Sequence, residues 1–195
     1  MKYIIGAVLL VAAIWFGTSY NGLVNSEENV GVSYSQIQNQ LNRQAELIPN
    51  LVKIVGQYAK HEKSTLVGLS EARAGVTAVG KIDPTKLAND PALQKQLIEA
   101  QASMNAALLK FTSTVENYPQ LKADAQFDKL FSEVAGSQNR ITVARMDNQN
   151  TVNAYNKQVR QLPGKWVAVI AGFEPKPYYE ASAAAQTAPE IKFDE

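Results

Sequence analysis

The chain has 195 residues, with 19 lysines and arginines against 18 aspartates and glutamates, and it contains no cysteine. This balance leaves no basic face of the kind that replaces counterions on nucleic-acid phosphates, so we expect no nucleic-acid partner. The lack of cysteine excludes disulfides, thiol nucleophiles, thiolate metal sites and a lipidated-cysteine anchor. The length suits one domain with its own core beside a short N-terminal segment.

The N-terminal segment contains a run of fifteen uncharged, mostly apolar residues, 3–17. A helix over 3–20 would be about 27 Å long, just short of a ~30 Å hydrocarbon layer. A cleaved signal peptide is the first alternative, because Lys2 precedes the run and the small residues 17–19 follow it. A buried core helix is the second. We favour a permanent anchor, since the run reaches the upper limit for a signal peptide and carries the bulky Trp15 near its end.

Charges beside the run predict its orientation in a membrane. Lys2 and the terminal amine precede it, whereas Glu27 and Glu28 follow it and no cation comes before Arg43. Cations close to a span resist translocation. We therefore expect a cytoplasmic N-terminus and a body on the outer side of the membrane.

Beyond the anchor, apolar residues recur at spacings of three and four, which predicts an all-α fold of long helices. Gln44, Arg145 and Asn148 occupy places where this spacing calls for an apolar residue. Short connections make neighbouring helices antiparallel. We expect a bent helix over about 20–75 with Pro49 in its middle, a loop over 75–90, helices over 91–118 and 124–162, a shorter helix over 165–171 ending at Gly172, and an extended segment over 173–179.

Several short motifs, taken as one ordered set, resemble the LemA family. They are Tyr20-Asn21-Gly22-Leu23-Val24, Leu47-Ile48-Pro49-Asn50-Leu51-Val52, Gly56-Gln57-Tyr58-Ala59-Lys60-His61-Glu62, Glu71-Ala72-Arg73-Ala74, Glu116-Asn117-Tyr118-Pro119-Gln120-Leu121-Lys122-Ala123, Asn139-Arg140-Ile141, Tyr155-Asn156, Gly172-Phe173 and Tyr178-Tyr179-Glu180-Ala181. The resemblance covers roughly residues 1–181. It implies a bacterial membrane protein with one N-terminal span and an antiparallel bundle of long helices. It implies no catalytic residues.

The expected domains are a transmembrane anchor over 1–20, a helical bundle over 21–181 and a disordered tail over 182–195. With the resemblance, the expected location is the bacterial cell (inner) membrane, crossed once.

His61 is the only histidine, and it stands beside Glu62. A zinc-protease helix needs two histidines four residues apart, so we expect no such metal site and no cofactor. His61 could serve as a pH-sensitive contact, but a solvated or capping histidine is favoured. No serine, lysine or carboxylate pair has the spacing of a nucleophile with its base, and we expect no enzyme.

Polar residues on the helices form the candidate site. They could make a buried network that fixes the helix register, which we favour, or bind an anionic group between two arginines. Asn50, beside Pro49, could mark a recognition feature, although a structural bend is favoured. The candidate residues are Glu46, Asn50, Glu71, Asn139, Arg140 and Arg145.

Four aromatic residues near the C-terminus, Trp166, Phe173, Tyr178 and Tyr179, either pack across the end of the bundle, which is favoured, or form an exposed docking strip. The leading functional hypothesis is a non-enzymatic membrane-anchored scaffold or interaction module of the bacterial envelope, with a protein partner or self-association. The alternative is a receptor-type domain that binds a small anionic or peptide ligand near Arg140 and Arg145.

Overall fold

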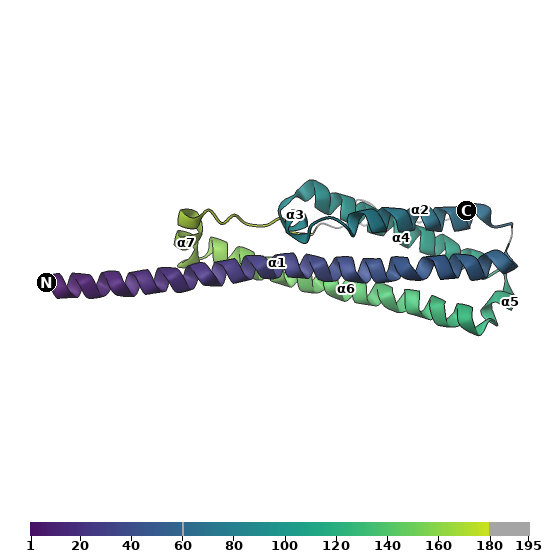
Figure 1. Cartoon of the computed structure of the whole chain (residues 1–195), viewed down its shortest axis with the longest axis horizontal. Helices are drawn as coiled ribbons and strands as arrows, with labels where there is room; N and C mark the ends of the chain where they lie inside the picture. Colours follow the sequence, from purple (N-terminus) through teal and green to yellow (C-terminus); the bar gives the residue numbers. More distant parts are fainter. Residues whose placement is uncertain (60, 180–195) are drawn as a thin grey trace, which may run out of the picture.

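Helix α1 runs without a break from Lys2 to Tyr58 in the computed structural model, which describes residues 1–59 and 61–179. Residues 1–15 are all exposed, whereas Leu23 is buried among other helices. Judged by length and composition, α1 is the one helix in the described chain that could cross a membrane, and its apolar window is unburied. Figure 1 shows this end of α1 projecting beyond the other helices.

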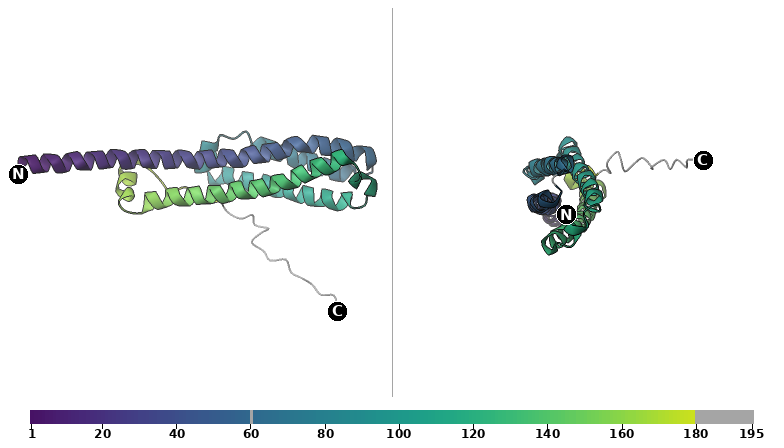
Figure 2. Two further views of the ribbon diagram at one scale, coloured as in Figure 1. Left: turned by 90° about the horizontal axis from the view of Figure 1, so that it is seen from below. Right: turned by 90° about the vertical axis from the view of Figure 1, so that its right-hand side faces the viewer.

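The other helices fold back along the second part of α1. Helices α1, α2, α4 and α6 run alternately in opposite directions along one axis (Figures 1 and 2). Helix α1 packs against α2 and α6, and α2 packs against α4. Their bounds are α2 Lys63–Val79, α3 Pro84–Asn89, α4 Pro91–Val115, α5 Pro119–Lys122, α6 Ala125–Arg160 and α7 Gly164–Ala171. The prediction of an all-α chain with an N-terminal apolar helix is confirmed over the described residues.

The predicted bent helix over 20–75 is wrong, because the chain reverses direction between α1 and α2. The reversal contains neither glycine nor proline, so the sequence there lacks a local turn signal. Contacts from elsewhere hold it: Ala59 is buried, and the Tyr118 hydroxyl donates to the Glu62 carboxylate at 3.1 Å. The bundle consequently has one more long helix than the three that the apolar spacing predicted.

The predicted loop over 75–90 is largely helical. Helix α2 continues to Val79, and Gln38 of α1 donates to the carbonyls of Val79 and Ile82 at 2.9 and 2.8 Å. The Asp83 side chain then caps α3 by accepting from the Thr85 backbone N–H at 2.8 Å. Such capping satisfies backbone groups that a helix end leaves free.

Three predicted helix ends are confirmed. Asp90 caps α4 by accepting from the backbone N–H of Ala92 at 2.8 Å, and Asp124 caps α6 by accepting from that of Gln126 at 2.9 Å. Gly172 ends α7 in the left-handed conformation, with φ of 78°, which glycine adopts without a steric penalty.

Pro49 lies inside α1 without ending it. Because proline has no backbone N–H, the carbonyl of Ala45 lacks its usual partner one turn later. Arg73 of α2 takes that place: its Nε donates to the Ala45 oxygen at 3.0 Å. The proline therefore creates an acceptor on α1 that fixes the neighbouring helix, and the cost of the missing helical bond is partly offset.

We predict that Pro49 and Arg73 are energetically coupled. Replacing Arg73 by alanine should lower the free energy of unfolding by about 1–3 kcal/mol, the typical cost of losing a charged donor to a buried acceptor. In a Pro49→Ala background the loss should be smaller by about 1 kcal/mol, because residue 49 then supplies an N–H to Ala45. Urea unfolding in detergent micelles measures both values.

The control is Arg43→Ala, which breaks an exposed ion pair with Glu133 and should cost at most about 1 kcal/mol. Equal effects of Arg73→Ala in the two backgrounds would show that the Ala45 carbonyl is not what Arg73 recognises.

Candidate functional site

Two buried polar pairs join α1 to α6. Gln44 donates to the Ser137 hydroxyl at 2.9 Å, and Asn148 donates to the Ser33 hydroxyl at 2.8 Å. All four residues are buried. A buried polar group costs free energy unless it finds its partner, so sliding α1 against α6 by one turn would leave both pairs unmade. These two pairs, called here the polar rungs, set the register of the helices.

The segment Phe173–Tyr179, called here the strap, runs back along the bundle after α7 (Figure 1). Asn156 of α6 holds its middle by two hydrogen bonds to the backbone of Lys176: Nδ2 donates to the carbonyl at 2.9 Å, and the Lys176 N–H donates to Oδ1 at 2.8 Å. The Tyr155 hydroxyl donates to the carbonyl of Glu174 at 3.0 Å. The strap is therefore recognised mainly through its backbone.

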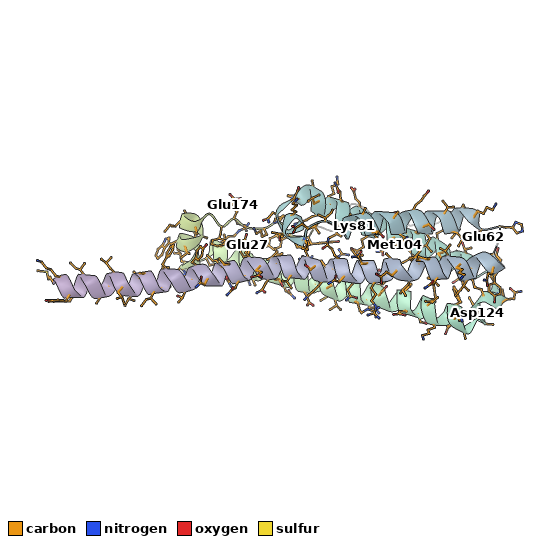
Figure 3. The ribbon with its side chains drawn as sticks, in the orientation of Figure 1. Glu27, Glu62, Lys81, Met104, Asp124 and Glu174 are labelled. Carbon is orange, nitrogen blue, oxygen red and sulfur yellow. The ribbon has the colours of Figure 1, made fainter. Side chains whose placement is uncertain are left out.

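The Lys176 side chain carries the strap across to α1. It is buried, and its ammonium group pairs with the Glu27 carboxylate and also donates to the amide oxygen of Asn89 in α3. Figure 3 shows Glu27 and Glu174 at the same end of the bundle, opposite Glu62 and Asp124. A buried ammonium group needs such a paired carboxylate, because its desolvation is otherwise costly.

Tyr179 ends the described strap between α4 and α6. Its hydroxyl donates to Gln101 of α4 at 2.9 Å, and the guanidinium of Arg145 in α6 lies 4.4 Å from the centre of its ring. Gln149 of α6 also donates to the Tyr179 carbonyl at 3.4 Å. The strap thus connects four helices, α1, α3, α4 and α6, and it acts as a tie across the bundle.

The buried tyrosines are held in their neutral form. Burial, with smaller effects from the carboxylates of Glu27 and Glu174, raises the pKa of Tyr155 from 10.0 to about 12. Burial also raises the pKa values of Tyr34 and Tyr179. Each phenol is thus kept protonated well above neutral pH, so these side chains act as hydrogen-bonding and packing groups.

An apolar groove of about 370 Å³ lies between α4 and α6, beyond Tyr179 along the same seam. Leu109 lines it and is 72% exposed, and Asn105 accepts a hydrogen bond of 2.9 Å from Gln138 across it. At one end the seam is filled by stacked aromatic rings, with Phe127 and Phe131 5.4 Å apart. The seam is therefore open only in part.

The candidate residues proposed from the sequence lie on three different helices and do not meet. Glu46, Asn50, Glu71 and Asn139 are exposed, and Arg140 and Arg145 are half-buried. Over the described residues, no hydrogen bond or ion pair joins any two of the six. His61 is exposed in the turn between α1 and α2. The functional roles suggested for these residues remain predictions.

The two arginines have separate environments. Arg145 stacks on Tyr179, as described above. Arg140 has two buried nitrogens, Nε and Nη2, without a partner in the described chain, and the same is true of the Gln40 side-chain oxygen on α1. The register set by Gln44 and Ser137 brings Gln40 level with Arg140. The Arg145 guanidinium lies against the Tyr179 ring and two Arg140 nitrogens are buried, and this geometry does not favour the anionic-ligand reading.

The residues that do fix the bundle were partly visible in the sequence. Gln44 and Asn148 interrupt apolar stripes, and each belongs to one of the polar rungs. Asn156 and Tyr155 belong to a motif of the resemblance, but nothing local indicates that they bind the strap. Nothing in the sequence indicates that Lys176 is buried and paired, because a single lysine in an extended segment resembles any solvated lysine.

Of the C-terminal aromatic residues, two pack and two do not. Tyr179 is buried, and Phe173 packs its ring 5.7 Å from that of Tyr20 in α1. Trp166 and Tyr178 are 59% and 44% exposed. The prediction of packing across the bundle therefore holds for half of this set.

The model of one protein family, LemA, matches residues 33–193. The chain belongs to the LemA family. Among its relatives are magnetosome proteins MamQ 1 and MamQ 2 of Paramagnetospirillum magneticum, each 25% identical over 182 residues, which are 86% of this chain and 67% of theirs. Magnetosome protein MamQ of Magnetospirillum gryphiswaldense is 24% identical over the same shares.

The LemA match includes the polar rungs, the Pro49–Arg73 contact and the strap, and it begins after the apolar segment of α1. It extends beyond Tyr179 to residue 193 and so covers most of the predicted tail over 182–195, which lies outside the described residues. Most of the residues that tie the helices together thus lie in the LemA segment, although Glu27, the partner of Lys176, precedes it.

We predict that Asn156→Ala frees the strap. It leaves the N–H and carbonyl of Lys176 without partners, which should weaken strap docking by about 1–3 kcal/mol. Amide hydrogen exchange over 173–179 should then become faster while exchange in α2 is unchanged. The matched control is Asn150→Ala, an exposed asparagine on the same helix. Unchanged strap exchange in Asn156→Ala would contradict the assignment.

Proposed function

We propose that this LemA-family chain is a non-enzymatic, membrane-anchored helical scaffold or protein-interaction module of the bacterial cell envelope. The observation that carries the proposal is the continuity of α1, whose unburied apolar end leads directly into a rigid, multiply tied bundle. A helix without a break transmits position and orientation, so the bundle would stand away from the bilayer as a rod. Membrane association also agrees with the family.

The polar chemistry of the bundle supports a structural role. Four side-chain amides of the bundle make hydrogen bonds to another helix, to the segment after α2 or to the strap: those of Gln38, Gln44, Gln101 and Asn156. Groups used in this way hold a shape and are not presented to a substrate. The described residues contain no group of three or more histidine or acidic side chains suited to a metal ion.

The groove between α4 and α6 is the proposed contact surface for a protein partner, which includes a second copy of the chain. It is apolar, it is partly open, and the exposed Leu109 stands at its edge beside the partly buried Phe131. Apolar side chains of a partner would bury this surface, which is the main source of binding free energy at protein interfaces. The receptor-type alternative near Arg140 and Arg145 is not favoured by the geometry of either arginine.

We predict that a photo-crosslinking amino acid at Leu109 captures one defined protein, or a second copy of the chain, in intact membranes. The same amino acid at Lys110, an exposed residue next to Leu109 that does not line the groove, is the control. A single discrete crosslinked band at Leu109 and none at Lys110 supports the proposal. Equal, diffuse patterns at the two positions would count against a specific docking surface.

The proposed orientation is a cytoplasmic N-terminus with the bundle outside the inner membrane. Because the chain has no cysteine, single introduced thiols report without background. We predict that Asn150→Cys in α6 reacts with a membrane-impermeant maleimide in intact cells, and that Tyr3→Cys reacts only after lysis. The reversed pattern would show that the bundle lies in the cytoplasm.

A further inference from the structure

Helix α7 carries an apolar face that nothing in the described chain covers. Leu162, just before the helix, and Trp166, Val169 and Ile170 within it are 63%, 59%, 74% and 73% exposed. The spacing of Trp166, Val169 and Ile170 places them on one side of the helix, and Leu162 lines the same surface. The opposite side is used for packing, since Val167 and Ala168 are buried. Both sides of this short helix are therefore apolar, and only one meets protein.

The position of α7 is fixed at the boundary between the apolar end of α1 and the bundle. Helix α7 packs against α1 and α6, and the ring of Phe173, just after it, lies 5.7 Å from that of Tyr20. Phe16 of α1 is the first partly buried residue, so the uninterrupted exposed stretch of α1 ends at this level. Figures 1 and 2 show α7 lying across the long axis of the bundle.

A close approach locks α7 to the end of α6. A Cβ added to Gly164, at the start of α7, would lie 2.4 Å from the backbone oxygen of Gln158. No side chain fits at that distance, so the glycine lets the two helices meet at a sharp corner. The corner is what turns α7 sideways and directs its apolar face away from the bundle.

The charges around the exposed face suit a lipid surface. Lys165 lines the same shallow surface as Leu162, Trp166, Val169 and Ile170. No acidic residue occurs between Arg160 and Phe173. Helices that lie in a membrane interface combine an apolar face that includes tryptophan with cations that meet anionic headgroups. An exposed apolar patch of this kind marks an interaction site and not ordinary solvated surface.

We infer that α7 is an interfacial helix, which inserts Leu162, Trp166, Val169 and Ile170 into the same bilayer that α1 is proposed to span. The inference rests on the proposed span, because the place of α7 beside residues 16–20 of α1 brings it to the membrane surface. Lys165 reaches the headgroup phosphates from the edge of the face. The bundle would then have two membrane contacts, the proposed span in α1 and the apolar face of α7, called here the membrane foot. The second contact would limit how far the bundle tilts relative to the bilayer.

Tryptophan fluorescence of the full chain in vesicles tests the inference, because the chain has only two tryptophans, Trp15 and Trp166. Vesicles of phosphatidylethanolamine and phosphatidylglycerol are prepared with and without bromine on the acyl chains, which quenches tryptophan on contact. In Trp15→Phe the remaining Trp166 should be quenched by brominated lipid and emit at a shorter wavelength. In Trp166→Phe the remaining Trp15 reports on the span.

Two further variants, both in the Trp15→Phe background, sharpen the test. Adding Trp166→Phe and Leu109→Trp moves the only tryptophan to an exposed site on α4, where it should not be quenched. Adding Val169→Asp and Ile170→Asp should abolish the quenching of Trp166 while the helical circular dichroism is retained, since both residues are exposed and support no packing.

The outcomes separate the inference from the proposed function. Quenching of Trp15 without quenching of Trp166 overturns the interfacial helix and leaves the span intact. Absence of quenching at both Trp15 and Trp166 overturns the interfacial helix and the proposed span together. Quenching at residue 109 equal to that at 166, or quenching of Trp166 that survives the two aspartates, also contradicts the inference, because neither result depends on the α7 face.

Discussion

The structure depends on α1 being one continuous helix whose first part is exposed and apolar and whose second part packs against the other helices. Residues 3–15 are exposed, uncharged and mostly apolar, and the residues from Leu23 onward form the central surface on which the other helices pack. A break between these parts would leave the bundle free to rotate against the apolar segment. The continuous hydrogen-bonded backbone prevents that, and with the proposed span it would also set the distance between the bilayer and each contact of the bundle.

Given this central helix, a small number of polar contacts select one arrangement of the others. An apolar seam alone tolerates shifts by whole turns, whereas the hydrogen bonds of Gln44 to Ser137 and of Asn148 to Ser33 form in one register only. The strap then connects α1, α3, α4 and α6 through Lys176, Asn156 and Tyr179. The tie and the corner at Gly164 place α7 beside the boundary of the apolar segment, so the proposed membrane foot follows from the same contacts that close the bundle.

The sequence predicted those features whose causes are local. Aspartates at 90 and 124 and Gly172 have capping chemistry that acts within one turn, and the helix ends fall there. The reversal at 59–62 depends instead on Tyr118, more than fifty residues away, and could not be seen from local spacing. Gln44 and Asn148 are recognisable in the sequence because they interrupt apolar stripes. Their partners, Ser137 and Ser33, are not, because the pairing depends on how the two helices are aligned. The register network expected from the sequence relies on the charges of Arg140, Arg145 and the glutamates, whereas the buried pairs that join α1 to α6 are neutral amides and hydroxyls.

The most direct test of the central claim is the intact mass of the protein recovered from carbonate-washed bacterial membranes. Carbonate removes peripheral proteins and leaves spanning ones. The continuous, retained α1 predicts that the full chain of 21.3 kDa stays in the membrane pellet with its N-terminal residues attached. Recovery of a shorter, soluble protein that begins near residue 20 would contradict it, because α1 would then serve as a cleaved leader and the bundle would have no anchor.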